Sequence, residues 1–278
     1  MKAILLLISI APAVALGWGE TGHRAVCQIA YDELSTVAQT QVDRLIKRDP
    51  EFDNFADACL FADGPPRIRR PEHYINVPRS FSAITKNECP MAETCLFNAI
   101  GSDLEILGNE STTDADKLLA LKLLGHWVGD MHQPLHVSFQ DDLGGNLVRK
   151  KDDEHRGNLH SVWDFDIIAH GIGDDYSTIA DRLRSEISDR DREQWKFDSP
   201  VEWANESYQI TISAETRYCT QQRGACWYSR DNLMLSRGEP VREFLPSDDY
   251  LLAHKDAVAL RMKQAGVRLA ALIDSALK

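Results

Sequence analysis

The sequence of 278 residues has no Cys-x-x-Cys pair, no low-complexity tract, no repeat of fixed period and no linker rich in Ser, Gly or Pro. The first absence argues against a cysteine-ligated zinc site, and the others favour a single domain. After residue 17, no apolar run is long enough to span a bilayer, so we expect a soluble mature chain without a membrane anchor. Patterns typical of β-strands are also sparse, which leaves helices as the main element.

Positive charge is in deficit, with 31 Lys and Arg against 43 Asp and Glu and a formal net charge of −12. This balance argues against broad electrostatic binding of nucleic acid or of an anionic membrane. It does not exclude an enzyme that acts on phosphodiesters, because bound divalent cations can reverse the sign of the charge within a site.

The N-terminus has the organisation of a secretory signal peptide. Lys2 precedes an apolar run, and the small residues Ala15 and Gly17 stand where signal peptidase needs them. We predict a signal peptide at 1–17 and a single mature domain at 18–278, in a secreted or periplasmic protein. Cleavage after Gly17 frees the α-amine of Trp18, and a free amine together with its own carbonyl oxygen can chelate a metal ion.

Six cysteines behind a signal peptide indicate disulfides formed in an oxidising compartment. The sequence alone leaves several connectivities open. The pairs Cys89–Cys95 and Cys219–Cys226 are plausible because their members are close in the chain, which leaves Cys27 and Cys59 for each other. Asn109-Glu-Ser111 and Asn205-Glu-Ser207 are glycosylation sequons, which matter if the source is eukaryotic.

Apolar residues recur at helical spacing through most of the chain, so we predict an all-α fold. Helices are expected at 32–48, from a Thr112/Thr113 cap to Pro134, from the Ser199-Pro-Val-Glu202 capping box through Ile212, and over 248–278. Residues 143–148 are expected to form a short hairpin at most.

Histidine and aspartate recur together in a way that suits a metal site. His126/Asp130 and His160/Asp164 each place an imidazole and a carboxylate on one helix face, and Pro134 ends the first of these helices just before His136. The other groups in the set are the Trp18 amine, His23, Asp63 and His73.

Ligation by nitrogen and oxygen without thiolates is typical of catalytic zinc. The set is too large for one zinc ion and suits three if Asp130 bridges two of them. The remaining histidines fit no ligand pattern, and His132 lies about 200° around the helix from Asp130, so it should face away from the set. The histidines left outside the set are His132, His155, His170 and His254.

At these residues the chain resembles the secreted, zinc-dependent, single-strand-specific nucleases of the mung bean nuclease type, which include the fungal S1 and P1 nucleases. The matching motifs are Trp18-Gly-x-x-Gly-His23, Ala-Asp63, His73-Tyr-Ile-Asn76, His126-x-x-x-Asp130-x-His-Gln-Pro-Leu-His136, Gly-Gly-Asn146 and Gly-Asn-Leu-His160-x-x-x-Asp164. The C-terminal third shares the helical character of the family rather than its motifs.

The resemblance implies a mainly helical fold of the phospholipase C/nuclease type with three zinc ions in a cleft. It assigns one zinc to Asp63, His73, His126 and bridging Asp130, and a close neighbour to Asp130, His23 and the Trp18 amine and carbonyl. The third takes His136, His160 and Asp164. The implied reaction is endonucleolytic hydrolysis of single-stranded DNA and RNA to 5′-phosphate products, with 3′-nucleotidase activity, by a monomer that needs no protein partner.

The resemblance also implies roles for residues that contact the substrate. Asp63 would orient the attacking water or accept its proton. An arginine should hold the phosphate, and Arg67 is our candidate, although Gly64-Pro-Pro shifts its register and leaves Arg69 and Arg70 as competitors. Tyr74 would stack on a base, which tolerates any base but requires it unpaired. Asn76 would contact the base edge, and Asn146 the phosphate or a base. Trp127 and Trp163 are expected to be packing residues.

Two alternative functions remain open at this point. A zinc phospholipase C shares the cluster and the fold, but it carries Glu where this chain has Asp164, differs in the spacing of its ligands and lacks this cysteine set. A non-enzymatic zinc-binding protein is the second alternative, and it would leave open coordination positions without a substrate.

Overall fold

A computed structural model describes residues 18–150, 157–222, 224–227, 242–244 and 246–278. The predicted signal peptide at 1–17 and His155 lie outside the described residues. The helices are α1 (Glu20–Glu33), α2 (Thr36–Ile46), α3 (Phe55–Ala58), α4 (Leu96–Gly108), α5 (Asp114–His132), α6 (Leu159–Ser161), α7 (Ile167–Gly171), α8 (Tyr176–Ser185), α9 (Asp189–Lys196), α10 (Pro200–Thr211) and α11 (Asp248–Ala276). The prediction of an all-α fold is confirmed.

Short elements connect these helices. Helical turns form at η1 (Phe61–Asp63), η2 (Arg70–His73), η3 (Pro134–His136), η4 (Val162–Asp166) and η5 (Ala214–Thr216). The strands form two-stranded pairs, parallel for β1 (Ile75–Val77) with β2 (Val137–Phe139) and for β3 (Val148–Lys150) with β6 (Arg242–Phe244), and antiparallel for β4 (Thr220–Gln222) with β5 (Ala225–Trp227).

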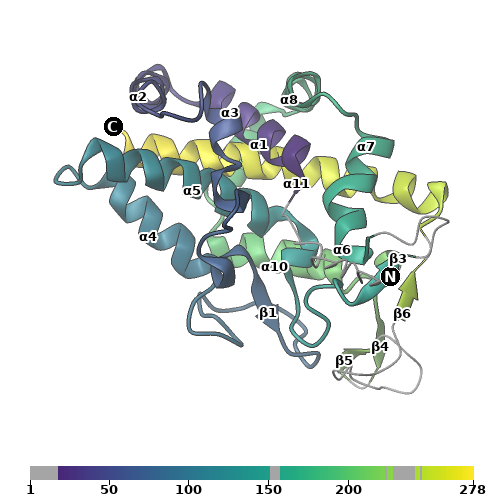
Figure 1. Cartoon of the computed structure of the whole chain (residues 1–278). Coiled ribbons are helices and arrows are strands. Elements are labelled where there is room, and N and C mark those ends of the chain that lie inside the picture. Colours follow the sequence, from purple (N-terminus) through teal and green to yellow (C-terminus); the bar gives the residue numbers. More distant parts are fainter. Residues whose placement is uncertain (1–17, 151–156, 223, 228–241, 245) are drawn as a thin grey trace, which may run out of the picture.

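The long C-terminal helix α11 runs through the middle of the molecule, drawn in yellow in Figure 1, and packs against α1, α4, α5, α7 and α9. Gly266 weakens the helical pattern of α11 in the sequence, and the structure shows why glycine stands there. A Cβ at this position would lie 2.3 Å from Ile29 Cγ2, so the close approach of α1 to α11 requires its absence. Among the described residues, no helix is both long and apolar enough to cross a membrane.

One expectation about local structure is wrong. The helix expected at 32–48 is divided, because Leu34 is extended and the side chain of Ser35 accepts a hydrogen bond from Ala38 N to begin α2. Residues 143–148, expected to form a short hairpin at most, form a turn that leads into β3, since β2 before the turn pairs with β1 and β3 pairs with β6. Both strand partners lie far away in the sequence, where periodicity cannot reveal them.

The other expected helices are confirmed. Thr113 caps α5 by accepting from Asp116 N, and the helix ends at His132, just before Pro134. Ser199 caps α10 in the expected box with Glu202. The structure contains the disulfides Cys27–Cys59, Cys89–Cys95 and Cys219–Cys226.

Candidate metal centre

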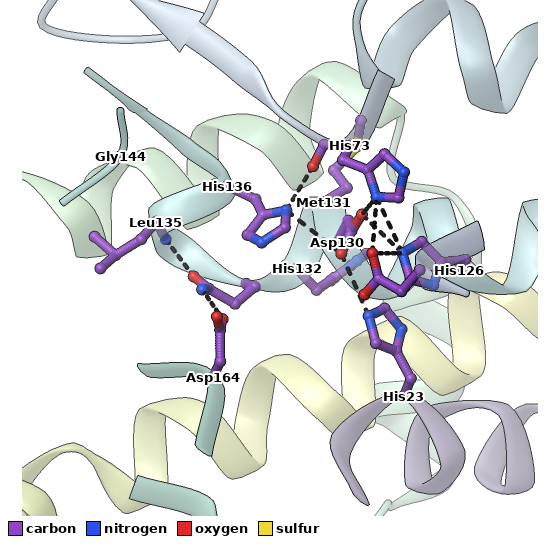
Figure 2. A network of polar contacts seen from close by, with 12 residues as sticks. His23, His73, His126, Asp130, Met131, His132, Leu135, His136, Gly144 and Asp164 are labelled. Atoms are coloured by element: carbon purple, nitrogen blue, oxygen red, sulfur yellow. Dashed lines mark hydrogen bonds and ion pairs between the residues drawn. The ribbon is translucent and has the colours of Figure 1, made fainter. Parts of the chain in front are cut away.

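All eight predicted histidine and aspartate side chains come together in one region, although they come from seven different elements. Most of them surround the C-terminal end of α5, as Figure 2 shows for His23, His73, His126, Asp130, His136 and Asp164. The parallel pair β1–β2 follows His73 on one strand and His136 on the other, so pairing Ile75 with Val137 brings these two histidines side by side.

The first group of ligand atoms has the spacing of a tetrahedral site. His73 Nδ1 lies 3.1 Å from Asp130 Oδ2, His126 Nε2 lies 3.3 Å from the same oxygen, and the two nitrogens are 3.2 Å apart. Asp63 Oδ1 lies 3.6 Å from His73 Nδ1 and 3.7 Å from His126 Nε2. Zinc bonds of about 2.0–2.2 Å place tetrahedral ligands about 3.3–3.6 Å apart. These four side chains therefore fit one ion.

Backbone carbonyls orient four of the predicted ligand imidazoles, those of His73 and His126 in this group and those of His136 and His160 nearby. In each ring one nitrogen faces a carbonyl oxygen, which fixes the tautomer and turns the other nitrogen toward the centre of the cluster. The pairs are His73 Nε2 with Ile68 O at 3.0 Å, His126 Nδ1 with Cys59 O at 2.8 Å, His136 Nδ1 with His73 O at 2.5 Å and His160 Nδ1 with Gly144 O at 2.7 Å.

A second group consists of His136, His160 and Asp164, whose ligand atoms all lie within 4.8 Å of one another. Asn158 caps α6 and begins the turn with His160, and the π-helical turn η4 that follows carries Asp164. Gln133 Nε2 donates to Asp164 Oδ1 at 2.5 Å, which leaves Oδ2 facing the two imidazoles. The sequence interpretation missed this role of Gln133, although the residue stands between Asp130 and His136.

Asp130 joins the first group to His23. Its Oδ2 faces His73 and His126, whereas its Oδ1 lies 3.3 Å from His23 Nε2. The His23 ring stacks on His126 with a centroid separation of 4.0 Å. Trp18 is fully buried beside His23, since both approach Gly129. This arrangement is the one that a carboxylate bridging two ions requires.

The buried polar atoms without a hydrogen-bond partner in the described structure are concentrated here. Such atoms cost free energy unless an ion or water satisfies them. Those in the cluster are both ring nitrogens of His23, Oδ1 of Asp130, Nε2 of His136 and of His160, and Oδ2 of Asp164. Oδ1 of Asp63 also lacks an aligned hydrogen bond, but it lies in an ion pair with Arg67. The donor set and its spacing therefore fit divalent metal ions.

Burial keeps most of these imidazoles in the neutral form that binds metals. It lowers the pKa of His23, His73 and His136, and that of His160 to about 4. Burial acts against ionised Asp130 as well, but the surrounding histidines outweigh it and hold the pKa of this carboxyl well below its usual range. Asp130 is therefore an anion. His126 beside it differs from the other ligand imidazoles, because Asp130 and Asp63 outweigh burial and raise its pKa.

Arg67 is the arginine that the structure places at the cluster. Its Nε lies 2.8 Å from Asp63 Oδ1, and its Nη2 lies 2.8 Å from His73 Nδ1. Arg69 points elsewhere and pairs with Asp103 at 2.6 Å, and Arg70 is exposed. The geometry thus favours Arg67 over its two competitors as a phosphate ligand.

The predicted substrate residues line one cavity of about 200 Å³ beside the second group. Its walls include Arg67, Tyr74, Asn76 and Asn146 together with the ligand side chains of His136 and His160. Trp127 and Trp163 are instead buried packing residues, with their indole N–H groups bonded to Asp103 and Tyr250. The cavity therefore offers a ring, two amides and a guanidinium next to the cluster.

A buried ionic network that the sequence interpretation missed holds the turn that carries Asn146. Arg79 Nη2 donates to Asp142 Oδ2 at 2.7 Å, the hydroxyl of Tyr218 donates to Asp142 Oδ1 at 2.5 Å, and Gly145 N donates to the same oxygen at 3.1 Å. Residues 143–145 all have positive φ, which is strained for any residue except glycine. Long-range charge pairing thus stabilises an unusual backbone next to the cavity.

The predicted non-ligand histidines lie away from the cluster where the structure describes them. His132 faces the opposite side of α5, where its Nδ1 donates to Val128 O at 2.7 Å and its Nε2 accepts from Arg268 at 3.0 Å. His254 is buried against Trp163, and His170 is partly exposed near Asp248. The prediction for His132 is confirmed.

We expect Gly129→Ala to disturb the metal centre. The new Cβ would lie 2.7 Å from His23 Nδ1, and His23 cannot retreat because it stacks on His126. Displacement of His23 should lower the metal content of the protein and reduce its activity about 10–100-fold, which is the usual loss when the orientation of a metal ligand is disturbed. Elemental analysis and kinetics of the purified variant measure this.

Gly101→Ala in α4 is the matched control, since nothing lies within 4 Å of its Cβ. It should keep full metal content and raise the free energy of unfolding by about 0.5–1 kcal/mol. Equal behaviour of the two variants would contradict the assigned position of His23.

Comparison with known proteins agrees with this geometry. The S1/P1 nuclease family matches residues 18–278. Endonuclease 2 of Arabidopsis thaliana is 28% identical over 274 residues, covering 93% of this chain and 90% of the relative, and Endonuclease 4 is 30% identical over 281 residues, covering 94% and 89%. Nuclease S1 of Aspergillus oryzae is 30% identical over 166 residues, 56% of each chain. The chain therefore belongs to the S1/P1 nuclease family and is a hydrolase of nucleic acids.

Proposed function

We propose that the protein is a secreted or periplasmic zinc-dependent endonuclease that hydrolyses single-stranded DNA and RNA to 5′-phosphate products and also acts on 3′-nucleotides. The observation that carries this proposal is the set of buried, unsatisfied ligand atoms that opens onto a cavity lined by Tyr74, Asn76, Asn146 and Arg67. The names of the relatives favour this interpretation over a phospholipase C, and the built cavity favours an enzyme over a metal-binding protein.

We assign three zinc ions to the cluster. One is held by Asp63, His73, His126 and Asp130, and the second by Asp130, His23 and the Trp18 amine and carbonyl that appear after cleavage of residue 17. The third is held by His136, His160 and Asp164. When bound, these ions would supply positive charge that stabilises the phosphate and the departing oxygen. They would also lower the pKa of a bound water to near neutral, so that hydroxide is available as the nucleophile.

The chain's own residues then position the substrate. Asp63 is half-buried at the ligand atoms of His73 and His126, where its carboxylate can accept a proton from the attacking water. Arg67 neutralises the phosphate. Tyr74 stacks on the base of the nucleoside that leaves with the 3′-oxygen, while Asn76 and Asn146 bond its edge or its phosphate. A duplex cannot offer a base to Tyr74 without unpairing it, which accounts for a preference for single strands.

We expect Tyr74→Ala to reduce kcat/KM about 10–100-fold on both single-stranded oligonucleotides and 3′-AMP. The expected loss corresponds to about 1–3 kcal/mol of stacking per base. Product mapping on one 5′-labelled oligonucleotide, with and without a chelator, tests the reaction itself. Zinc content, measured on the same protein, should stay near three ions per chain.

Tyr74→Phe is the control variant because it keeps the ring, and it should retain most of the activity. Products with a 3′-phosphate, or full activity in the chelated protein, would overturn the proposed function. An equal loss in the Phe and Ala variants would overturn the stacking role alone.

A further inference from the structure

A larger cavity, of about 720 Å³, opens onto the metal centre on the side away from the Tyr74 cavity. It reaches the cluster at His23 and Asp63, whereas the Tyr74 cavity reaches it at His136 and His160. No lining residue is shared by the two cavities, and the ion pair of Asp63 with Arg67 lies between them. A strand that crosses the cluster from one cavity therefore arrives in the other.

Two aromatic rings line this cavity, and a buried lysine contacts them. Phe52 and Phe61 both line it, and they pack edge to face with their centroids 6.5 Å apart. The ammonium group of Lys122 lies 4.0 Å from the Phe61 centroid and pairs with Asp49 at 2.8 Å. Lys122 is buried and does not line the cavity, so it braces the rings from the far side. Rings fixed in this way suit stacking with a flat partner.

The charged side chains that line the cavity determine which planar ligands it can bind. Glu20 and Glu51 are exposed lining residues, and among the described residues no lysine or arginine lines the cavity. Arg24, which lies outside the lining, is 3.6 Å from Glu20, whereas Glu51 has no such pair among the described residues. Carboxylates repel a phosphate but accept hydrogen bonds from the amino groups of bases, as they do from the N4 amino group of cytosine. The lining therefore suits a nucleobase that carries an amino group and disfavours an additional phosphate.

We propose that this cavity binds the base of the nucleotide that follows the scissile phosphate, and that Glu20 and Glu51 make it prefer cytosine, adenine or guanine over uracil or thymine. The inference rests on the proposed function, in which the nucleoside that leaves with the 3′-oxygen occupies the Tyr74 cavity. The nucleotide that keeps the 5′-phosphate must then lie on the side of His23 and Asp63. Phe52 and Phe61 stack on its base, and the carboxylates read its amino group.

The test compares two dinucleoside monophosphates, ApC and ApU. Their second bases differ at C4, where cytosine has an amino group and uracil has a carbonyl group. The control substrate is 3′-AMP, which has no second nucleoside. We expect wild-type kcat/KM to be about tenfold higher for ApC than for ApU, within the range of one well-placed base contact. Glu51→Gln should reduce this preference to about threefold or less. An unchanged preference in Glu51→Gln and in the Glu20→Gln/Glu51→Gln double variant would overturn the role of the carboxylates.

Phe52→Ala should lower the ratio of kcat/KM for ApC to that for 3′-AMP about tenfold, because only ApC places a base in this cavity. Asp53→Asn is the matched control, since Asp53 is the exposed neighbour of Phe52 and does not line the cavity. A ratio that is the same in wild type, Phe52→Ala and Asp53→Asn would overturn the inference. Failure of the wild type to hydrolyse 3′-AMP and both dinucleotides would overturn the proposed function instead.

Discussion

Asp130→Asn should lose zinc and activity together, with a fall in kcat of at least about 100-fold. Asp130 is fully buried, and each of its oxygens faces a different part of the cluster, Oδ1 toward His23 and Oδ2 toward His73 and His126. An amide keeps the shape but removes the anionic charge that two cations share. Elemental analysis should find about one retained ion per chain, the one assigned to the group of His136.

Two variants on α5 separate this effect from damage to the fold. Asp116→Asn makes the same chemical change at an exposed position of the helix and should keep full zinc content and activity. His132→Gln removes a buried partner of Arg268 on the other side of the helix, so it should lower the melting temperature while the zinc content stays intact. Loss of zinc in either variant, or retention of three ions in Asp130→Asn, would contradict the bridging assignment.

A chain that retains residues 1–17, or that carries a tag directly before Trp18, should have about one zinc fewer and about 100-fold less activity than the cleaved chain. The reason is that the α-amine of Trp18 is then a peptide nitrogen, which is a poor metal ligand. Trp18 is buried beside His23, and Gly19 N donates to Asp164 O at 2.9 Å, so the position of this terminus is set by the same elements that carry the ligands.

Rescue distinguishes a blocked ligand from a misfolded protein. A protease site placed so that cleavage leaves Trp18 as the first residue should restore zinc content and activity without refolding. A cleavage that leaves one additional residue before Trp18 is the control and should not restore them. Full activity in the extended, uncleaved chain would refute a role for the amine.

Features determined by local sequence could be predicted, and those determined by distant partners could not. The Thr113 cap and Pro134 mark the two ends of α5, and the four-residue spacing of His126 and Asp130 on that helix places both at the cluster. The choice among Arg67, Arg69 and Arg70 needed the structure, because the carboxylate of Asp103, which engages Arg69, lies 34 residues further along the chain. Arg79, Asp142 and Tyr218 also meet only through folding.

The disulfide Cys27–Cys59 ties the metal centre to the redox state in which the chain folds. Cys27 lies one helical turn after His23 on α1, and the carbonyl of Cys59 orients the ring of His126. A Cβ at Gly125 would lie 2.3 Å from Cys59 Sγ, so the bond is packed directly against α5 just before His126. The bridge therefore joins α1, which carries His23, to the end of α3, four residues before Asp63. We therefore expect chains produced in a reducing host to hold less metal than oxidised chains, because without the bridge α1 and the Cys59 segment are no longer tied together.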